Sequence, residues 1–85
     1  MFFVYVLQSI KDGKRYVGCT NNLKRRLQEH NSGLAESTRY RIPFKLIYFE
    51  AYLNRSDAFA REKILKGQWG RKFLQRVLKN YIKNS

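Results

Sequence analysis

The chain has 85 residues, of which 44% are hydrophobic and 15% aromatic. That supports one small globular domain and leaves no room for a second. Lys and Arg number 18 against 6 Asp and Glu, which gives a formal net charge of +12. Because such a charge destabilises a compact fold by self-repulsion, we expect a polyanionic partner, nucleic acid before an anionic membrane. A basic protein without such a partner is the plainer alternative.

The chain contains one cysteine, Cys19, and one histidine, His30. An intrachain disulfide and a structural zinc site are therefore excluded. The apolar amino terminus lacks the basic segment and the small-residue cleavage site of a signal peptide. No stretch approaches the roughly 20 apolar residues of a membrane span. We expect a cytoplasmic protein with no membrane partner.

Three segments have the composition of β-strands. Residues 2–9 are almost continuously apolar, which predicts a central strand covered on both faces. An Asp-Gly turn at 11–14 leads to a second strand at 15–18, which completes an antiparallel hairpin. A third strand is expected at 44–52, after Pro43. Strict alternation would place on one face of that strand Phe44, Leu46, Tyr48, Glu50 and Tyr52.

A first helix is expected from Leu23 to about Ser32, after a capped turn at 20–22. A helical wheel places three leucines on its core-facing side, at positions 23, 27 and 34. Arg26 and His30 fall on the same side. An arginine there either lays its stem over the core with its head in water, or reaches for a ligand such as a phosphate.

Two further helices follow the third strand. One is expected at 57–67, and the other from Trp69 or Gly70 to Ile82, with apolar residues at helical spacing. Trp69 is expected to be a core anchor between these helices. The sequence thus predicts an α+β fold, a three-stranded antiparallel sheet with about three helices in the order β-β-α-β-α-α.

Several of these segments together resemble the GIY-YIG nuclease superfamily, in particular its small standalone members. The two tripeptides of the family name correspond to Phe3-Val4-Tyr5 and Tyr16-Val17-Gly18. An arginine follows ten residues after the second tyrosine, at Arg26, and a histidine one helical turn later, at His30. The family's metal-binding glutamate, after an alanine-rich helix start, corresponds to Glu62. The resemblance covers residues 1–85, although Phe3 replaces the first glycine and no late asparagine can be assigned.

The resemblance implies a metal-dependent DNA endonuclease. Glu62 would hold Mg²⁺ or Mn²⁺, Arg26 would clamp the scissile phosphate, and Tyr5 and Tyr16 would line the site. His30 would relay a proton or contact phosphate. The sequence does not say which tyrosine activates the water. Because no DNA-binding domain is appended, we expect low sequence specificity or recognition of DNA structure.

Non-specific phosphate contacts are expected from cations outside this set. They are Arg39, Arg41, Lys66, Arg71 and Lys72. Each site residue also has a plainer interpretation: the tyrosines as core, and Glu62 as part of a surface ion-pair array with Lys63 and Lys66. The sequence also leaves open a basic module that binds DNA or RNA without cutting it, and basic surfaces alone cannot distinguish the two.

Overall fold

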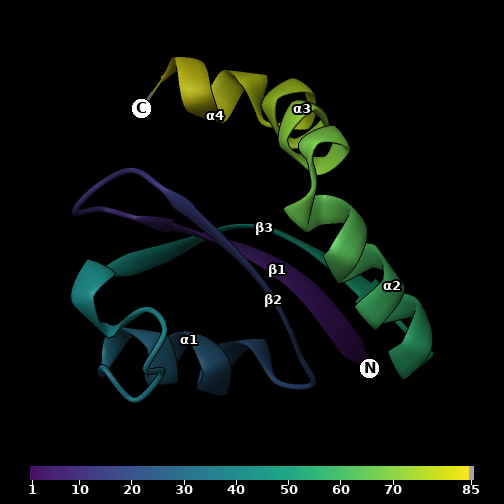
Figure 1. Ribbon diagram of the computed structural model, residues 1–85, viewed down its shortest axis with the longest axis horizontal. Coiled ribbons are helices and arrows are strands. Elements are labelled where there is room, and N and C mark those ends of the chain that lie inside the picture. Colours follow the sequence, from purple (N-terminus) through teal and green to yellow (C-terminus); the bar gives the residue numbers. More distant parts are fainter. Residues whose placement is uncertain (85) are drawn as a thin grey trace.

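The computed structural model describes residues 1–84, an antiparallel sheet with helices on both faces (Figure 1). The elements are β1 (Phe2–Ser9), β2 (Arg15–Thr20), α1 (Leu23–Asn31), a 3₁₀ turn (Arg39–Arg41), β3 (Phe44–Tyr52), α2 (Arg55–Lys66), α3 (Gln68–Val77) and α4 (Lys79–Lys83). The strand order is β2-β1-β3. The predicted α+β class and the order of its elements are confirmed.

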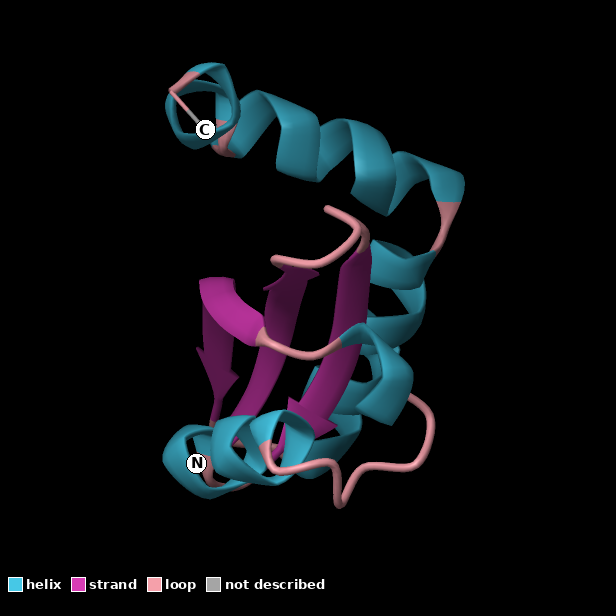
Figure 2. Ribbon diagram, turned by 90° about the vertical axis from the view of Figure 1, so that its left-hand side faces the viewer, coloured by secondary structure: helices cyan, strands magenta, loops and turns pink. Residues whose placement is uncertain are grey.

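The central strand β1 divides the apolar interior into two halves, because successive side chains of a strand point to opposite faces. Val4 packs with Ala58 and Leu65 of α2. Its neighbour Tyr5 packs on the opposite face, against the leucines of α1. The helices α1 and α2 therefore lie on opposite faces of the sheet. Figures 1 and 2 show α3 and α4 beyond the end of the sheet where the β1–β2 turn lies.

The third strand does not keep one face throughout, because its pairing with β1 shifts by one residue at Ile47. Such a bulge reverses the facing of the side chains that follow it. Phe44 and Leu46 pack on the α1 side, whereas Tyr48 and Tyr52 pack on the α2 side. The prediction that all four share a face is wrong.

Two asparagines begin the helices that carry the site. The side chain of Asn22 accepts a hydrogen bond from the amide of Arg25, and that of Asn54 one from the amide of Ser56. These caps satisfy backbone donors that the first helical turn leaves free. The helix α1 ends at Asn31, so Leu34 lies beyond it and is exposed, contrary to its predicted place in the core.

The carboxyl-terminal segment forms two helices instead of the single one predicted. The backbone leaves helical geometry at Leu78, between α3 and α4. Trp69 is 54% exposed and stacks on Phe73 with ring centroids 5.1 Å apart, so its predicted role as a core anchor is wrong. Among the described residues no helix is long and apolar enough to cross a membrane.

A largely buried ion pair attaches α2 to the sheet. Arg61 of α2 donates to Glu50 of β3 from Nε at 2.8 Å and from Nη2 at 3.0 Å. The hydroxyls of Tyr48 and Tyr52 donate to the same carboxylate. Burial alone would raise the pKa of Glu50, but these hydrogen bonds lower it to about 2. We refer to these four residues as the Glu50 clasp.

Candidate active site

The phenol of Tyr5 crosses over β2 at the one position where that strand has no side chain on its path. Tyr5 pairs with Gly18 in the β1–β2 register. A Cβ atom at Gly18 would fall well inside van der Waals contact with the Tyr5 hydroxyl. The glycine therefore lets a tyrosine of the central strand extend toward the outer edge of the sheet.

The Tyr5 hydroxyl lies in a buried polar network. It is 3.0 Å from Nε2 of His30, whose Nδ1 is 2.7 Å from Oγ1 of Thr38. Thr38 in turn donates its single hydroxyl proton to the carbonyl of Ala35 at 3.3 Å. The Thr38 oxygen therefore accepts a hydrogen bond from Nδ1–H of His30. Nε2 of His30 then carries no proton and accepts the hydrogen bond from the Tyr5 hydroxyl. The arrangement assigns a neutral imidazole that holds the phenol.

The pKa values agree with a neutral pair. Burial, together with a smaller effect of the positive charge of Arg26, lowers the pKa of His30 to about 4. Burial raises the pKa of Tyr5 to about 12, although the nearby guanidinium of Arg26 favours the phenolate and lowers the pKa in part. The negative charge of Glu62 also acts on this phenol and raises its pKa. Arg26 and Glu62, from helices on opposite faces, thus both influence Tyr5.

Tyr16 completes an aromatic group with Tyr5 and His30. Its ring centroid is 6.3 Å from that of Tyr5 and 4.9 Å from that of His30. Tyr5 is only 2% exposed, whereas Tyr16 is half-buried and lines a surface hollow. Of the two phenols, Tyr16 is the one that meets solvent.

Arg26 is held at the edge of this group by a neighbour on its own helix. Its Nη1 donates to Oε1 of Glu29 at 2.9 Å, and about a third of the side chain is exposed. The hydrogen bond to Glu29 raises the pKa of Arg26, and the Tyr5 phenol, which lies beside the guanidinium, raises it as well. The arginine thus has both a core-side stem and a charged head at the site.

Glu62 of α2 lies near β2, since its negative charge adds to burial in raising the pKa of Cys19 on that strand. Its side chain is 19% exposed, and its Oε2 forms an ion pair with Nζ of Lys66 at 2.9 Å. Glu62 follows Phe59 by three residues and precedes Lys66 by four, so the three share a helix face. Within residues 1–84 no three His, Cys, Asp or Glu side chains gather as in an all-protein metal site.

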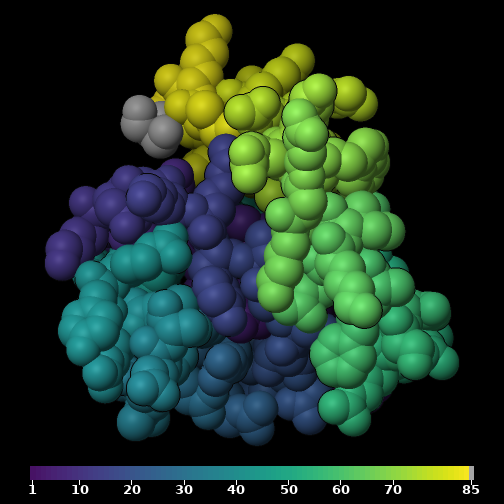
Figure 3. Space-filling model, in the orientation of Figure 1, coloured from purple at the N-terminus to yellow at the C-terminus, as the bar shows by residue number. Residues whose placement is uncertain are grey.

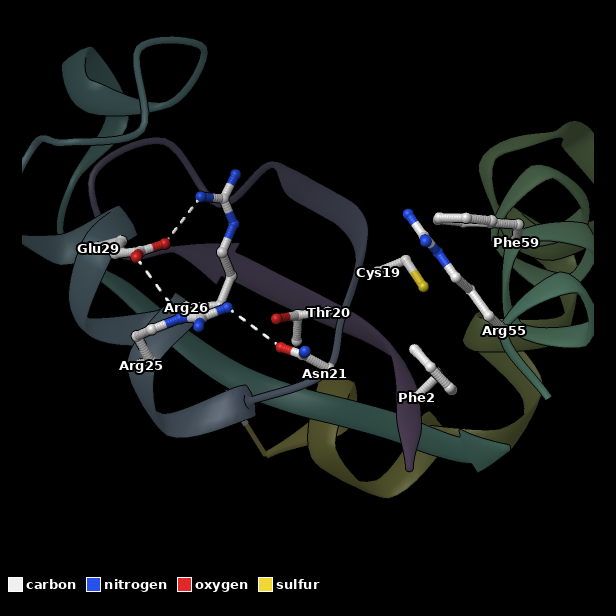
Figure 4. A pocket seen from close by; sticks show the side chains of 9 residues that line it. All are labelled: Phe2, Cys19, Thr20, Asn21, Arg25, Arg26, Glu29, Arg55 and Phe59. Atoms are coloured by element: carbon white, nitrogen blue, oxygen red, sulfur yellow. Dashed lines mark hydrogen bonds and ion pairs between the residues drawn. The ribbon is translucent and has the colours of Figure 1, made fainter. Parts of the chain in front are cut away.

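Two hollows open on either side of this group along β2 (Figure 3). The first hollow, of about 400 Å³, lies between α1 and the start of α2 and includes Arg26 (Figure 4). The second hollow, of about 570 Å³, lies between the β1–β2 turn and α3 and includes Tyr16. Glu62 lines neither, but Phe59 lines the first and Lys66 the second.

The cations expected to contact nucleic acid divide into two groups. Lys66 and Arg71 line the second hollow. Arg39, Arg41 and Lys72 line neither hollow. Arg41 is engaged instead in an ion pair with Asp12 at 3.2 Å, which ties the 3₁₀ turn to the β1–β2 turn.

Sequence reasoning missed several residues that the fold brings to the site. Thr38, in the loop between α1 and the 3₁₀ turn, is fully buried against His30, and no local signal distinguishes it. Arg25, Arg55 and Phe59 line the first hollow. Arg55 and Phe59 could have been suspected, because they are a cation and an aromatic residue on the helix that carries Glu62.

The chain is similar to a known domain family and to several known proteins. The family model of the GIY-YIG catalytic domain matches residues 1–75. A UPF0213 protein of Clostridium perfringens is 42% identical over 84 residues, which cover 98% of this chain and 89% of that protein. A UPF0213 protein of Streptococcus pneumoniae is 43% identical over 65 residues, 75% of this chain and 65% of that protein.

A solved structure is also similar. The solution NMR structure of a UPF0213 protein from Bacillus halodurans superposes with a TM-score of 0.54 and 33% identity, and the match covers 91% of this chain and 85% of that one. The matched domain includes the two tyrosine tripeptides, Arg26, His30 and Glu62 in their expected order. The chain belongs to the GIY-YIG catalytic domain family.

Proposed function

We propose that the protein is a divalent-metal-dependent endonuclease that hydrolyses phosphodiester bonds in DNA, with low sequence specificity or selection by DNA structure. The observation that carries the proposal is the position of the Tyr5 phenol, over Gly18, against His30 and under the influence of both Arg26 and Glu62. Family membership supports a nuclease, and the net charge of +12 supports a polyanionic substrate.

The two tyrosines would have different tasks. Tyr16, which meets solvent, would contact and orient the attacking water. Tyr5 is too buried for that and would position the site through its hydrogen bond to His30. Because burial lowers the pKa of His30 to about 4, its imidazole would stay neutral at pH 7 and hold the Tyr5 hydroxyl in place. An isolated phenol has a pKa of about 10, so any phenol that acts as a base at neutral pH needs nearby positive charge.

Arg26 would bind the phosphate that is cut. Its guanidinium can donate to two phosphoryl oxygens at once, and one edge is already held in place by Glu29. The charge that develops on those oxygens would then be stabilised from the start of the reaction. Loss of one such donor typically lowers the rate by roughly 10²- to 10³-fold.

Glu62 is the side chain suited to hold the metal ion. One carboxylate suffices for Mg²⁺ or Mn²⁺ when the ion keeps several waters and shares an oxygen of the bound phosphate. The ion pair with Lys66 would have to open for this, which an exposed lysine can do by moving its flexible stem. When bound, the ion would neutralise phosphoryl charge and help the leaving oxygen.

A nicking assay on supercoiled plasmid DNA with Mg²⁺ or Mn²⁺ tests the proposal. Wild-type protein should nick the plasmid, and Arg26→Ala and Glu62→Gln should be slower by at least about 10²-fold. Lys63→Gln, a change at the exposed neighbour of Glu62, is the matched control and should cut normally.

The basic charge also favours a module that binds DNA or RNA without cutting. That alternative would be adopted if wild-type protein binds nucleic acid tightly and never nicks, linearises or trims any DNA form. A large preference for RNA in salt-matched binding assays would overturn the assignment of DNA as substrate.

A further inference from the structure

The first hollow combines features that the chemistry at Tyr5 and Glu62 does not require. It opens between α1 and the start of α2, across the carboxyl end of β2 (Figure 4). Its volume of about 400 Å³ lies within the range of sites that hold small organic ligands. Among its lining residues, Arg26 and its partner Glu29 have a role in the proposed reaction, and the other seven do not.

One wall of the hollow is an aromatic ring paired with a cation. The guanidinium of Arg55 lies 5.0 Å from the ring centroid of Phe59. Phe59 is 41% exposed, and Figure 4 shows its ring and Arg55 side by side above Phe2. An aromatic face next to an arginine is the arrangement on which proteins stack nucleobases.

The opposite wall carries positive charge from α1. Arg25 and Arg26 both pair with Glu29, at 3.6 Å and 2.9 Å. With Arg55 the hollow therefore has three guanidinium groups against one carboxylate. This excess favours an anion, and the aromatic wall favours a planar ring, so a nucleotide satisfies both.

The position of Arg26 fixes which nucleotide this would be. Arg26 lines the hollow, and its guanidinium also lies beside the Tyr5 phenol. A phosphate held by Arg26 therefore belongs to the nucleotide next to the reacting bond. The second hollow lies on the other side of Tyr5, and no phenylalanine among the described residues lines it, so it lacks a pairing of a phenylalanine and an arginine.

We propose that the first hollow is a nucleotide subsite, in which Phe59 and Arg55 stack the base on one side of the scissile phosphate. The proposal rests on the proposed nuclease function. It predicts that cleavage depends on a base on that side of the bond, whatever the identity of that base, because every base has a face that stacks.

The test is a sequencing-gel assay of cleavage, bond by bond, on an oligonucleotide with one abasic residue. Wild-type protein should cut the bond on one side of the abasic residue roughly 5- to 100-fold more slowly than in the intact strand, with little change at the bond on its other side. Phe59→Ala should remove this difference, and Phe59→Trp should restore it. Phe49→Ala is the matched control, since Phe49 is 50% exposed on β3, outside both hollows.

The outcomes separate the subsite from the nuclease function. Equal cutting on both sides of the abasic residue by wild-type protein, or the same suppression in Phe59→Ala, would overturn the subsite while cleavage stands. If wild-type protein cuts nothing, the nuclease function fails. The subsite is then decided by the fluorescence of oligonucleotides that carry 2-aminopurine: a change on binding that Phe59→Ala abolishes supports it, and an equal change in both proteins overturns it.

Discussion

Gly18 of β2 has no side chain, and the position of the Tyr5 phenol from the neighbouring strand β1 depends on the space that this leaves. We predict that Gly18→Ala displaces the phenol, because the new Cβ would overlap the Tyr5 hydroxyl and Cζ. Nicking should fall by roughly 10- to 100-fold, since a shift of about 1 Å in a catalytic group has effects of this size. Stability should fall by about 1–3 kcal/mol, the usual result of overpacking, as measured by urea denaturation.

Gly67→Ala is the control for this change. A Cβ at Gly67 meets its nearest atom at 3.5 Å, an ordinary contact, so both activity and stability should be retained. Full activity in Gly18→Ala would show that Tyr5 does not need its present position for the reaction.

His30 should make the stability of the fold depend on pH. Its pKa is lowered from 6.5 to about 4 by burial, so the unfolded chain binds more protons between these values. The stability that the fold gains from keeping His30 neutral is therefore complete above pH 6.5 and declines as the pH falls toward 4. We expect wild-type protein to lose about 2 kcal/mol of unfolding free energy between pH 7 and pH 5. His30→Gln, measured by urea denaturation at both pH values, should lose much less, and equal losses would assign the effect to another group.

At the scale of elements, the Glu50 clasp should fix how α2 sits on the sheet, and with it the direction of the Glu62 face. We predict that Glu50→Gln destabilises the fold at pH 7 by about 2 kcal/mol, because it leaves Arg61 partly buried without its charged partner. The pKa of Glu50 is lowered from 4.5 to about 2. Its contribution in wild-type protein is thus present above pH 4.5 and lost as the pH falls through 2, and this acid loss should be smaller in Glu50→Gln.

Thermal melts of Asp12→Asn provide the comparison. The Asp12–Arg41 pair is more exposed than the Glu50–Arg61 pair, so its loss should have an effect of about 0–1 kcal/mol. If the two variants melt alike, the clasp contributes no more than a surface ion pair.

The elements also show what could be predicted from the sequence. The strands β1 and β3 have the predicted bounds, and α1 and α2 nearly so, because apolar patterns and asparagine caps are local signals. The bulge at Ile47 and the burial of Thr38 depend on which segments meet, and a local pattern cannot contain that. The helix break at Leu78 likewise falls inside an uninterrupted apolar pattern.

At the scale of the site the same limit holds. The order of Tyr5, Tyr16, Arg26, His30 and Glu62 was available from the resemblance, but the passage of Tyr5 over Gly18 follows only from the register of β1 and β2. The first hollow joins residues from three separate segments, namely the start of β1, the end of β2 with α1, and the start of α2, so no single stretch could have indicated it.

Across the whole molecule, the cations that line the two hollows are arranged along β2. The first contains Arg25, Arg26 and Arg55, and the second contains Lys14, Arg15, Lys66 and Arg71. They lie at the two ends of β2, with Tyr5 between them and Tyr16 at the edge of the second. A polyanionic strand that follows β2 would therefore meet cations before and after the reacting phosphate.

This distribution predicts how binding responds to salt. Each phosphate contact contributes about 0.7 to 0.9 to the slope of log K against log salt concentration, because its counterions are released on binding. Replacing Lys14 and Arg71 by Gln should reduce the slope by about 1.4 to 1.8, with no change in the melting temperature, since both side chains are exposed. The binding titrations use DNA without divalent ions, so that cleavage does not intervene.

The matched control removes the same charge elsewhere. Arg76→Gln with Lys83→Gln neutralises two exposed cations that line neither hollow. If net charge alone governed binding, both double variants would lose affinity and slope equally. A DNA path along β2 instead requires the Lys14 and Arg71 pair to have the larger effect, and an equal loss in the two proteins would contradict that path while leaving cleavage at the tyrosines untouched.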